Sequence, residues 1–255
     1  MLTWKLKKSV WKPEDSLPLA DRGFRYGMSV FETITVVAGR PLLLGEHLER
    51  LRRAAGTCGF ELPQLPDIDY ARLWSGLLRF YVTAGPGAPG DAFEGNVYAV
   101  FDQAEVGWDL PALRVMSSAA PYLPRPGGWK SGNYWQNIEA LGQAKRADCD
   151  EALVFNPAGM LVGAAMANVF LKIDGAWITP ALETGARNGA VRAWVLGCLG
   201  ASEGILESRD VDRCSAAFLT NSRIGIRSVR ELDGRPLADE AADLQQKYFD
   251  DIFAA

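Results

Sequence analysis

The sequence predicts an α/β (α+β) protein of two domains, and three observations lead to this class. Strand-like alternation and the helical spacing of apolar residues both occur in each half of the chain. The chain of 255 residues is long enough for two domains of ordinary size. A stretch rich in proline and glycine lies between the halves. We expect a smaller N-terminal α/β domain at 1–120, an interdomain linker at 121–129 and a larger C-terminal domain at 130–255.

The first half contains strands and one clear helix. Residues 30–44 predict two strands around a turn at Gly39, and residues 45–60 predict a helix with its apolar residues on one face. Residues 67–85 begin with helical spacing and become extended toward their end. A long loop of glycine and proline follows, and residues 96–102 predict another strand.

The second half begins with a helix after Lys130, because Trp135, Ile138 and Leu141 recur at helical spacing. Residues 151–180 predict a series of short strands, joined by tight turns that contain glycine. A second helix, an apolar strand and a C-terminal amphipathic helix complete the chain, over 188–200, 216–229 and 239–255.

Composition excludes several classes of function. The net charge is −4 and no basic run is present, so we expect no nucleic-acid partner. No apolar stretch reaches the ~18 residues that a membrane span needs. No signal peptide is apparent, so we expect a cytoplasmic protein. The four cysteines are scattered, and His47 is the one histidine, so the sequence predicts no metal site and no disulfide framework.

Lys130 raises the first question about chemistry. It follows a Gly-Gly-Trp turn and precedes Gly132, on backbone that is flexible and open to close approach. A solvated surface charge is the ordinary interpretation of such a lysine. An amine directed into a cleft is the alternative, and the local sequence leaves both open.

Two polar turns and one arginine are candidates for binding a phosphate. The stretch TGARNGAV places glycines before a helix, where backbone N–H groups and the helix dipole favour an anion. The stretch LTNSRIG ends a strand with two hydroxyls and an amide. Arg50 is either a solvated helix arginine or a phosphate clamp. Together with Lys130, these pieces suggest a phosphorylated aldehyde cofactor, because a lysine amine condenses with an aldehyde.

These residues resemble the fold-type IV pyridoxal-phosphate enzymes, also called the class IV aminotransferase family. The resemblance covers roughly residues 15–240 and rests on five motifs in order: DRGFRYGMSVFETI, EHLERLRRAA, the segment from KSGNYWQNIEAL to AMANVFL, GAVR, and FLTNSRIGIRSVRELDGRPL. It implies a two-domain architecture like that of D-amino acid aminotransferase, with a cofactor-binding C-terminal domain. It also implies pyridoxal 5′-phosphate as the cofactor, a small amino-acid-like substrate and a homodimer.

The resemblance also implies roles for individual residues. Lys130 would bond to the cofactor aldehyde and act as acid and base at the substrate carbon. Seven further positions would contact the cofactor, namely Arg50, Ala190, Val191, Asn221 and Ser222 at the phosphate, Tyr134 near the phenolic oxygen, and Gly163 at the pyridine nitrogen. Tyr26 and Phe31 would line the substrate pocket. Members usually carry a glutamate at the position of Gly163, which keeps the ring nitrogen protonated. Glycine offers neither charge nor hydrogen bond there.

Thr33 bears on which member this chain resembles most. Branched-chain enzymes tend to have glycine at this position, whereas the aminodeoxychorismate lyases have threonine, whose hydroxyl can relay a proton. The stretch FLTNSRIGIRSV is also more similar to the lyases. The loop TAGPGAPGD lacks the arginine that several relatives use to hold a substrate carboxylate, and Arg25 or Arg125 are possible substitutes.

Three functions follow from the resemblance. The first is a 4-amino-4-deoxychorismate lyase of folate biosynthesis, which releases pyruvate and 4-aminobenzoate, with Lys130 and Thr33 as catalytic residues. The second is an aminotransferase acting on a branched-chain or D-amino acid. The third is a degenerate cofactor-binding homologue with little activity, because Gly163 replaces the usual glutamate. Gly163 favours elimination over transamination, because in elimination the developing negative charge leaves with the departing group and need not be held on the cofactor ring.

Overall fold

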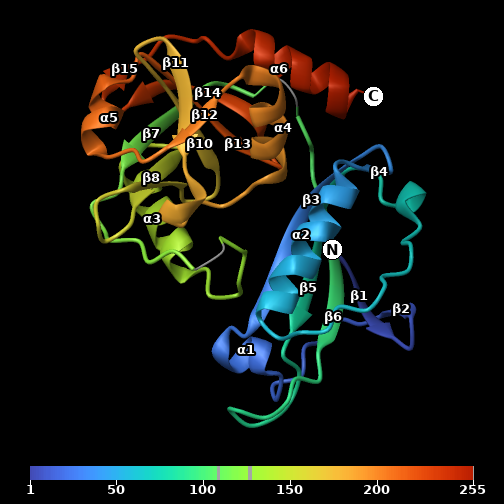
Figure 1. Ribbon diagram of the computed structural model, residues 1–255. Coiled ribbons are helices and arrows are strands. Elements are labelled where there is room, and N and C mark those ends of the chain that lie inside the picture. The colour runs from blue at the N-terminus through green and yellow to red at the C-terminus, as the bar shows by residue number, and fades with distance from the viewer. Residues whose placement is uncertain (108–109, 126–127, 255) are drawn as a thin grey trace. The chain divides into compact units, whose positions relative to one another are not determined.

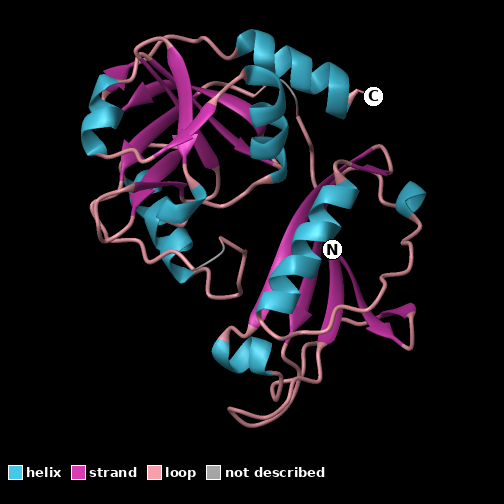
Figure 2. Ribbon diagram, in the orientation of Figure 1, coloured by secondary structure: helices cyan, strands magenta, loops and turns pink. Residues whose placement is uncertain are grey.

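The computed structural model describes residues 1–107, 110–125 and 128–254 (Figure 1). The chain divides into two compact units, Met1–Val106 with Trp129–Tyr134, and Gly107–Gly128 with Trp135–Ala255. Each unit mixes helices with a curled sheet, which confirms the predicted class (Figure 2). The bounds of the predicted domains stay a prediction, and Pro126 and Gly127 of the predicted linker lie outside the described residues.

The first unit is built on a six-stranded antiparallel sheet of order β2-β1-β6-β5-β3-β4. Its strands are β1 (Leu2–Lys7), β2 (Val10–Pro13), β3 (Ser29–Val37), β4 (Arg40–Pro41), β5 (Gly76–Thr83) and β6 (Asn96–Gln103). Its helical segments are α1 (Arg22–Tyr26), α2 (Leu44–Thr57) and the 3₁₀ turn η1 (Tyr70–Arg72).

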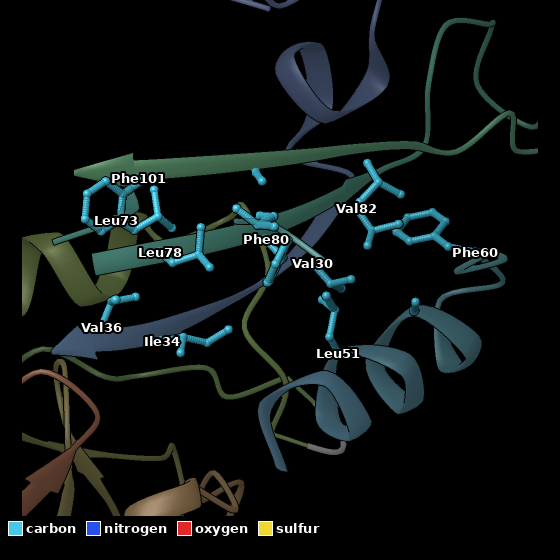
Figure 3. Packing of buried hydrophobic residues seen from close by; sticks show 14 of the residues in the cluster. Val30, Ile34, Val36, Leu51, Phe60, Leu73, Leu78, Phe80, Val82 and Phe101 are labelled. Carbon is cyan, nitrogen blue, oxygen red and sulfur yellow. The ribbon is translucent and has the colours of Figure 1, made fainter. Parts of the chain in front are cut away.

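Helix α2 covers one face of this sheet, and the core of the unit lies between them. Val30 and Ile34 of β3, Leu78 and Phe80 of β5 and Leu51 of α2 are all at most 1% exposed. Figure 3 shows Leu51 pointing from the helix toward the sheet. Burial of each such side chain stabilises the fold by ~1.5–3 kcal/mol. Because side chains alternate along a strand, the residues between these on β3 and β5 face the other side of the sheet.

The segment that carries Lys130 runs along the first half of β3. Phe31 N donates to Lys130 O at 3.0 Å, and Gly132 N donates to Ser29 O at 2.9 Å. An antiparallel bridge joins Val30 to Ser131. A Cβ at Gly132 would lie 2.3 Å from Ser29 Oγ, so this close approach requires glycine. The backbone of Lys130 is thereby fixed to the strand that carries Phe31 and Thr33.

The second unit contains a nine-stranded sheet of order β12-β11-β10-β13-β14-β7-β8-β9, with β15 paired to β14. Its strands are β7 (Leu113–Ser117), β8 (Glu151–Phe155), β9 (Leu161–Ala164), β10 (Asn168–Ile173), β11 (Ala176–Pro180), β12 (Ser202–Gly204), β13 (Ala216–Asn221), β14 (Gly225–Leu232) and β15 (Arg235–Pro236). Its helices are α3 (Trp135–Arg146), η2 (Leu182–Thr184), α4 (Ala190–Leu199), α5 (Ser208–Arg213), α6 (Ala242–Tyr248) and the π-helical turn η3 (Phe249–Phe253).

The sheet of the second unit is buried on both faces. On one side, Ala140 and Ala144 of α3 pack with Ala152 and Val154 of β8. Elsewhere in the sheet, Phe170 of β10 stacks on Phe218 of β13, with ring centroids 4.7 Å apart. These contacts hold β10 and β13 side by side at the ends where their polar residues lie.

Most of the predicted elements are present. The helices expected at 45–60, after Lys130 and at 188–200 are α2, α3 and α4, and most of the expected strands are found. The single strand predicted over 216–229 is wrong, because the polar turn after Asn221 divides it into the antiparallel pair β13 and β14. The predicted C-terminal helix is shorter and divides into α6 and η3; Ala255 lies outside the described residues. The hairpin of β1 and β2 and the short helices α1 and α5 were not predicted. Among the described residues, no helix has the length and apolar character to cross a membrane.

Candidate active site

Lys130 lies against a group of aromatic rings in the first unit. Its Nζ is 5.2 Å from the centroid of the Phe31 ring and 5.9 Å from that of Tyr134. The two rings meet edge to face at 5.4 Å, and Phe31 stacks on Tyr81 at 5.3 Å. Lys130 itself is half-buried, and rings at these distances attract a charged amine through their faces.

Thr33 lies two residues beyond Phe31 on the same face of the sheet. Its direct cross-strand neighbour on β5 is Arg79, whose Nη1 pairs with the carboxylate of Asp102. Sequence reasoning missed Arg79. The signal was available, because Arg79 is two positions from Tyr81 on a strand, and alternation places both on one face. The sheet face that carries the Lys130 aromatic group therefore also carries a hydroxyl and a guanidinium.

Arg50 on α2 is held by two buried residues that sequence reasoning did not assign to the site. Its Nη2 donates to Glu32 Oε2 at 2.7 Å and its Nε donates to Glu32 Oε1 at 3.3 Å. His47 Nδ1 lies 2.8 Å from the same Glu32 Oε2. The side chains of His47 and Glu32 are 1% and 5% exposed, and that of Arg50 is 17% exposed. A lone histidine on a helix gave no signal for this cluster.

The remaining predicted residues of the first unit are more exposed. Tyr26 ends α1, a helix capped by Asp21, and is 41% exposed. The guanidinium of Arg25 lies 4.9 Å from the Tyr26 ring centroid. Arg125, the other residue considered for a substrate carboxylate, is exposed on the second unit. No contact described for Arg25 or Arg125 supports a role in carboxylate binding, whereas Arg79 shares its face with Thr33.

The start of α4 in the second unit is a candidate anion site. The helix begins after Gly189, and no side chain of the described residues caps its N-terminus, so the first N–H groups, of Ala190 and Val191, are oriented along the helix axis. A Cβ at Gly189 would lie 2.2 Å from Asn168 Oδ1, so the turn packs closely on the end of β10. Thr220 pairs directly with Asn168 on the neighbouring strand.

The hydroxyl of Thr220 is buried and has no hydrogen-bond partner among the described residues. A buried hydroxyl without a partner costs roughly 1–3 kcal/mol. A phosphate oxygen bound beside the α4 N-terminus would supply one. Thr220 is one of the two hydroxyl residues of the stretch LTNSRIG, which the sequence marks as a candidate phosphate-binding turn.

Asn221 and Ser222 form the turn that follows β13. Asn221 Oδ1 accepts from the backbone N–H groups of Arg223 and Ile224, both at 2.9 Å. Its Nδ2 donates to Met166 O at 3.0 Å. The side chain of Asn221 thus shapes the turn, and its predicted role at a phosphate would fall to the backbone of the turn and to Ser222.

Gly163 lies on β9 opposite Val154, and a Cβ there would be 3.1 Å from Ala167 O. The turn that follows is held by Glu151, whose Oε2 accepts from Met166 N at 3.1 Å and whose Oε1 accepts from Ala152 N at 3.0 Å. Burial raises the pKa of Glu151 to about 7, although these backbone hydrogen bonds lower it.

The predicted site residues thus form two groups, each described within its own unit. Lys130, Phe31, Tyr134, Thr33 and Arg50 belong to the first unit, and Gly163, Ala190, Val191, Asn221 and Ser222 belong to the second. Among the residues that the structure describes, no cluster of His, Cys, Asp or Glu could hold a metal ion. The chemistry available is an amine, two guanidinium groups, hydroxyls and a helix N-terminus that suits an anion.

The sequence matches the model of the amino-transferase class IV family over residues 29–232. A Methanocaldococcus jannaschii protein assigned as a branched-chain-amino-acid aminotransferase is 28% identical over 251 residues, which cover 89% of this chain and 86% of that protein. Aminodeoxychorismate lyase of Vibrio harveyi is 24% identical over 237 residues, which cover 85% of this chain and 88% of the lyase. The similarity thus extends to both reaction types.

Solved structures share the whole fold. The branched-chain aminotransferase of Thermoproteus uzoniensis, solved with norvaline, superposes with a TM-score of 0.85 at 22% identity, covering 97% of this chain and 93% of that one. A Legionella pneumophila protein assigned as a 4-amino-4-deoxychorismate lyase gives a TM-score of 0.81 at 25% identity, covering 93% and 95%. The two-unit architecture is thus common to both.

Proposed function

Because this chain belongs to the class IV aminotransferase family, whose enzymes depend on pyridoxal 5′-phosphate, we propose that it is a lyase acting on 4-amino-4-deoxychorismate. The products would be pyruvate and 4-aminobenzoate. The single observation that carries this choice is the position of Thr33, directly opposite Arg79 on the sheet face that bears Phe31. The guanidinium of Arg79 would bind the carboxylate of the leaving group, and the hydroxyl of Thr33 would donate a proton to it.

The residues present fit the cofactor at its phosphate and at its aldehyde. The uncapped N–H groups at the start of α4 suit a phosphate, as does the hydroxyl of Thr220, which has no partner among the described residues. In the first unit, the amine of Lys130 would bond to the aldehyde, and Arg50 is a second candidate for the phosphate. When bound, pyridoxal phosphate supplies the electron-withdrawing ring that makes an α-proton acidic.

The residues of this chain would divide the remaining work. Lys130, whose amine lies beside the rings of Phe31 and Tyr134, would take the α-proton of the substrate. Arg79 would bind a substrate carboxylate through a guanidinium fork. Thr33 would donate a proton toward the departing enol oxygen of pyruvate. Gly163 provides no carboxylate to hold a proton on the ring nitrogen of the cofactor. The negative charge that develops when the α-proton is removed would therefore leave with pyruvate more readily than it would be held on the ring.

An aminotransferase is the second candidate, because relatives of that activity match over most of the chain. Transamination would require Lys130 to return the proton taken from the substrate carbon to a different atom, at the other end of the conjugated system. That step depends most on an electron-poor ring, and Gly163 offers no carboxylate to maintain one. A homologue with little turnover would instead bind the cofactor and show neither reaction.

The experiment offers the purified protein 4-amino-4-deoxychorismate and measures pyruvate and 4-aminobenzoate. We expect both products in equal amounts, and loss of both in Lys130→Ala. Lys145→Ala is the matched control, because Lys145 is an exposed lysine on α3 that pairs only weakly with Asp150 at 3.8 Å. Amino-group transfer to a keto acid without release of pyruvate would favour the aminotransferase, and an inert protein with bound cofactor would favour the degenerate homologue.

A further inference from the structure

We propose that Glu32 and His47 act as positioning residues that fix the guanidinium of Arg50 for the cofactor phosphate. This inference rests on the proposed function, because it takes Arg50 to be a phosphate-binding residue. Neither Glu32 nor His47 need contact the cofactor. Their effect would be exerted through the direction in which Arg50 points.

The geometry is that of a clamped arginine. The carboxylate of Glu32 occupies the Nε–Nη2 edge of the guanidinium, with distances of 3.3 and 2.7 Å. A phosphate would be met by the opposite edge, which consists of Nη1 and the second hydrogen of Nη2. An arginine held by a carboxylate on one edge keeps its other edge in one orientation, so less side-chain entropy is lost when an anion binds.

His47 completes the clamp from the same helix. It is three residues before Arg50 on α2, so the two side chains leave one face of the helix. His47 Nδ1 lies 2.8 Å from Glu32 Oε2 and 2.9 Å from Arg50 Nη2. Nδ1 thus faces both a carboxylate oxygen and a guanidinium N–H, so its role depends on the tautomer. The proposal places the proton on Nδ1, so that Nδ1–H and Nη2–H both donate to Glu32 Oε2.

The burial of Glu32 and His47 costs the fold free energy. Glu32 and His47 are almost completely buried, and burying a carboxylate is unfavourable unless donors surround it. Apolar residues such as Val30 and Ile34 occupy the neighbouring positions on the same face of β3. A third apolar residue at position 32 would stabilise this core more simply. In this proposal, the role of the buried pair is to hold the guanidinium of Arg50.

Electrostatics alone predicts the opposite effect of Glu32, and this makes the inference testable. A carboxylate next to a phosphate-binding arginine repels the phosphate, so its removal should strengthen binding. If Glu32 positions Arg50, its removal should weaken binding, because the guanidinium loses its orientation. The sign of the change in affinity separates the two effects.

The experiment titrates pyridoxal 5′-phosphate into the cofactor-free protein and follows the absorbance band of the lysine-bound cofactor. Glu32→Gln should raise the dissociation constant about tenfold, the usual scale for loss of a charge-assisted hydrogen bond. Glu49→Gln is the matched control, since Glu49 is an exposed carboxylate of α2 that pairs with Arg52 and Arg53. Glu49→Gln removes the same charge and should leave the dissociation constant within about twofold of that of the parent.

Two further variants test the clamp. His47→Asn keeps a donor near the position of Nδ1 and should retain most of the affinity for pyridoxal 5′-phosphate. His47→Leu has no donor and should weaken the affinity about as much as Glu32→Gln does. The ³¹P resonance of bound cofactor should shift in Glu32→Gln and not in Glu49→Gln. If a variant fails to fold, as judged by near-ultraviolet circular dichroism, Glu32→Asp gives a shorter carboxylate with the same expected loss.

Arg50→Ala separates failure of this inference from failure of the site assignment. If Arg50→Ala leaves the affinity unchanged, Arg50 does not bind the phosphate and the assignment of the site is wrong. If Arg50→Ala weakens binding but Glu32→Gln leaves it unchanged or strengthens it, the positioning role of Glu32 is overturned. Because His47 is the one histidine of the chain, its ¹⁵N resonances report directly whether Nδ1 carries the proton, and an unprotonated Nδ1 would contradict the proposed clamp.

Discussion

A single buried carboxyl, Glu151, holds the turn that follows Gly163 through the N–H of Met166. It does so at the cost of keeping a carboxyl out of water, and burial raises its pKa from 4.5 to about 7. The charged form accepts the two backbone hydrogen bonds best, while the protonated form is the one that burial favours. The residue that secures this turn is therefore sensitive to pH near neutrality.

Glu151 should make the stability of the protein fall as pH rises from about 4.5 to about 7. In this window the unfolded chain has released the proton while the folded chain retains it, so the unfolded state is favoured by rising pH. Glu151→Gln cannot titrate. The free energy of unfolding of the parent relative to this variant should therefore decline by roughly 3 kcal/mol across the window. Urea unfolding at several pH values measures it, and a constant difference would contradict the raised pKa.

Thr220 provides a second test at the scale of one residue. Its buried hydroxyl is without a partner among the described residues, so a phosphate at the α4 N-terminus would gain one hydrogen bond from it. Thr220→Val should weaken binding of pyridoxal phosphate about five- to tenfold and leave the cofactor-free protein as stable or more stable. Thr220→Ser keeps the hydroxyl and should retain the affinity. Equal affinity in the valine variant would show that the hydroxyl faces something else.

At the scale of elements, the segment 129–134 is tied to β3 by close backbone contact. Gly132 allows this, because a Cβ there would collide with Ser29 Oγ at 2.3 Å. Lys130 is two residues away, and its carbonyl is held by Phe31 N. The backbone of Lys130 is therefore held by its contact with β3.

Gly132→Ala should displace Lys130 and destabilise the first unit by about 1–3 kcal/mol. The fraction of pyridoxal phosphate that borohydride traps on the protein should fall. Ser29→Ala removes the colliding oxygen, so the double variant Ser29→Ala, Gly132→Ala should recover most of both losses. Absence of recovery in this double-mutant cycle would show that the contact with Ser29 does not fix the segment.

The sequence predicts an element when the residues that determine it lie close together along the chain. Helix α2 and strand β3 were predictable, because Leu51 and Val30 follow periodic patterns set by one core. The short helix α1 was missed because its cap, Asp21, is recognised only with its distant partners Thr83 and Asn96. Glu32 was missed because its partners His47 and Arg50 lie on α2, a separate element. The cross-strand register that sets Arg79 opposite Thr33 was not predicted either. The roles assigned by resemblance to the phosphate turns stay predictions.

At the scale of the whole molecule, each unit carries predicted site residues of its own. Lys130 and its neighbouring aromatic rings belong to the first unit, and the start of α4 and Gly163 belong to the second. The family and fold are common to lyases and aminotransferases, so the fold alone does not set the reaction. The predicted homodimer stays a prediction. What distinguishes the two reactions in this chain is the set of side chains around the reacting carbon.

The most direct measurement is therefore the ratio of pyruvate release from 4-amino-4-deoxychorismate to amino-group transfer from amino acids, for the parent and for Gly163→Glu. A Cβ at position 163 would lie 3.1 Å from Ala167 O, so Gly163→Ala serves as the control for backbone displacement. We predict that the parent releases pyruvate and transfers amino groups slowly or not at all. We also predict that Gly163→Glu, but not Gly163→Ala, raises transfer. Rapid amino-group transfer by the parent, unchanged by the new carboxylate and without pyruvate release, would contradict the account.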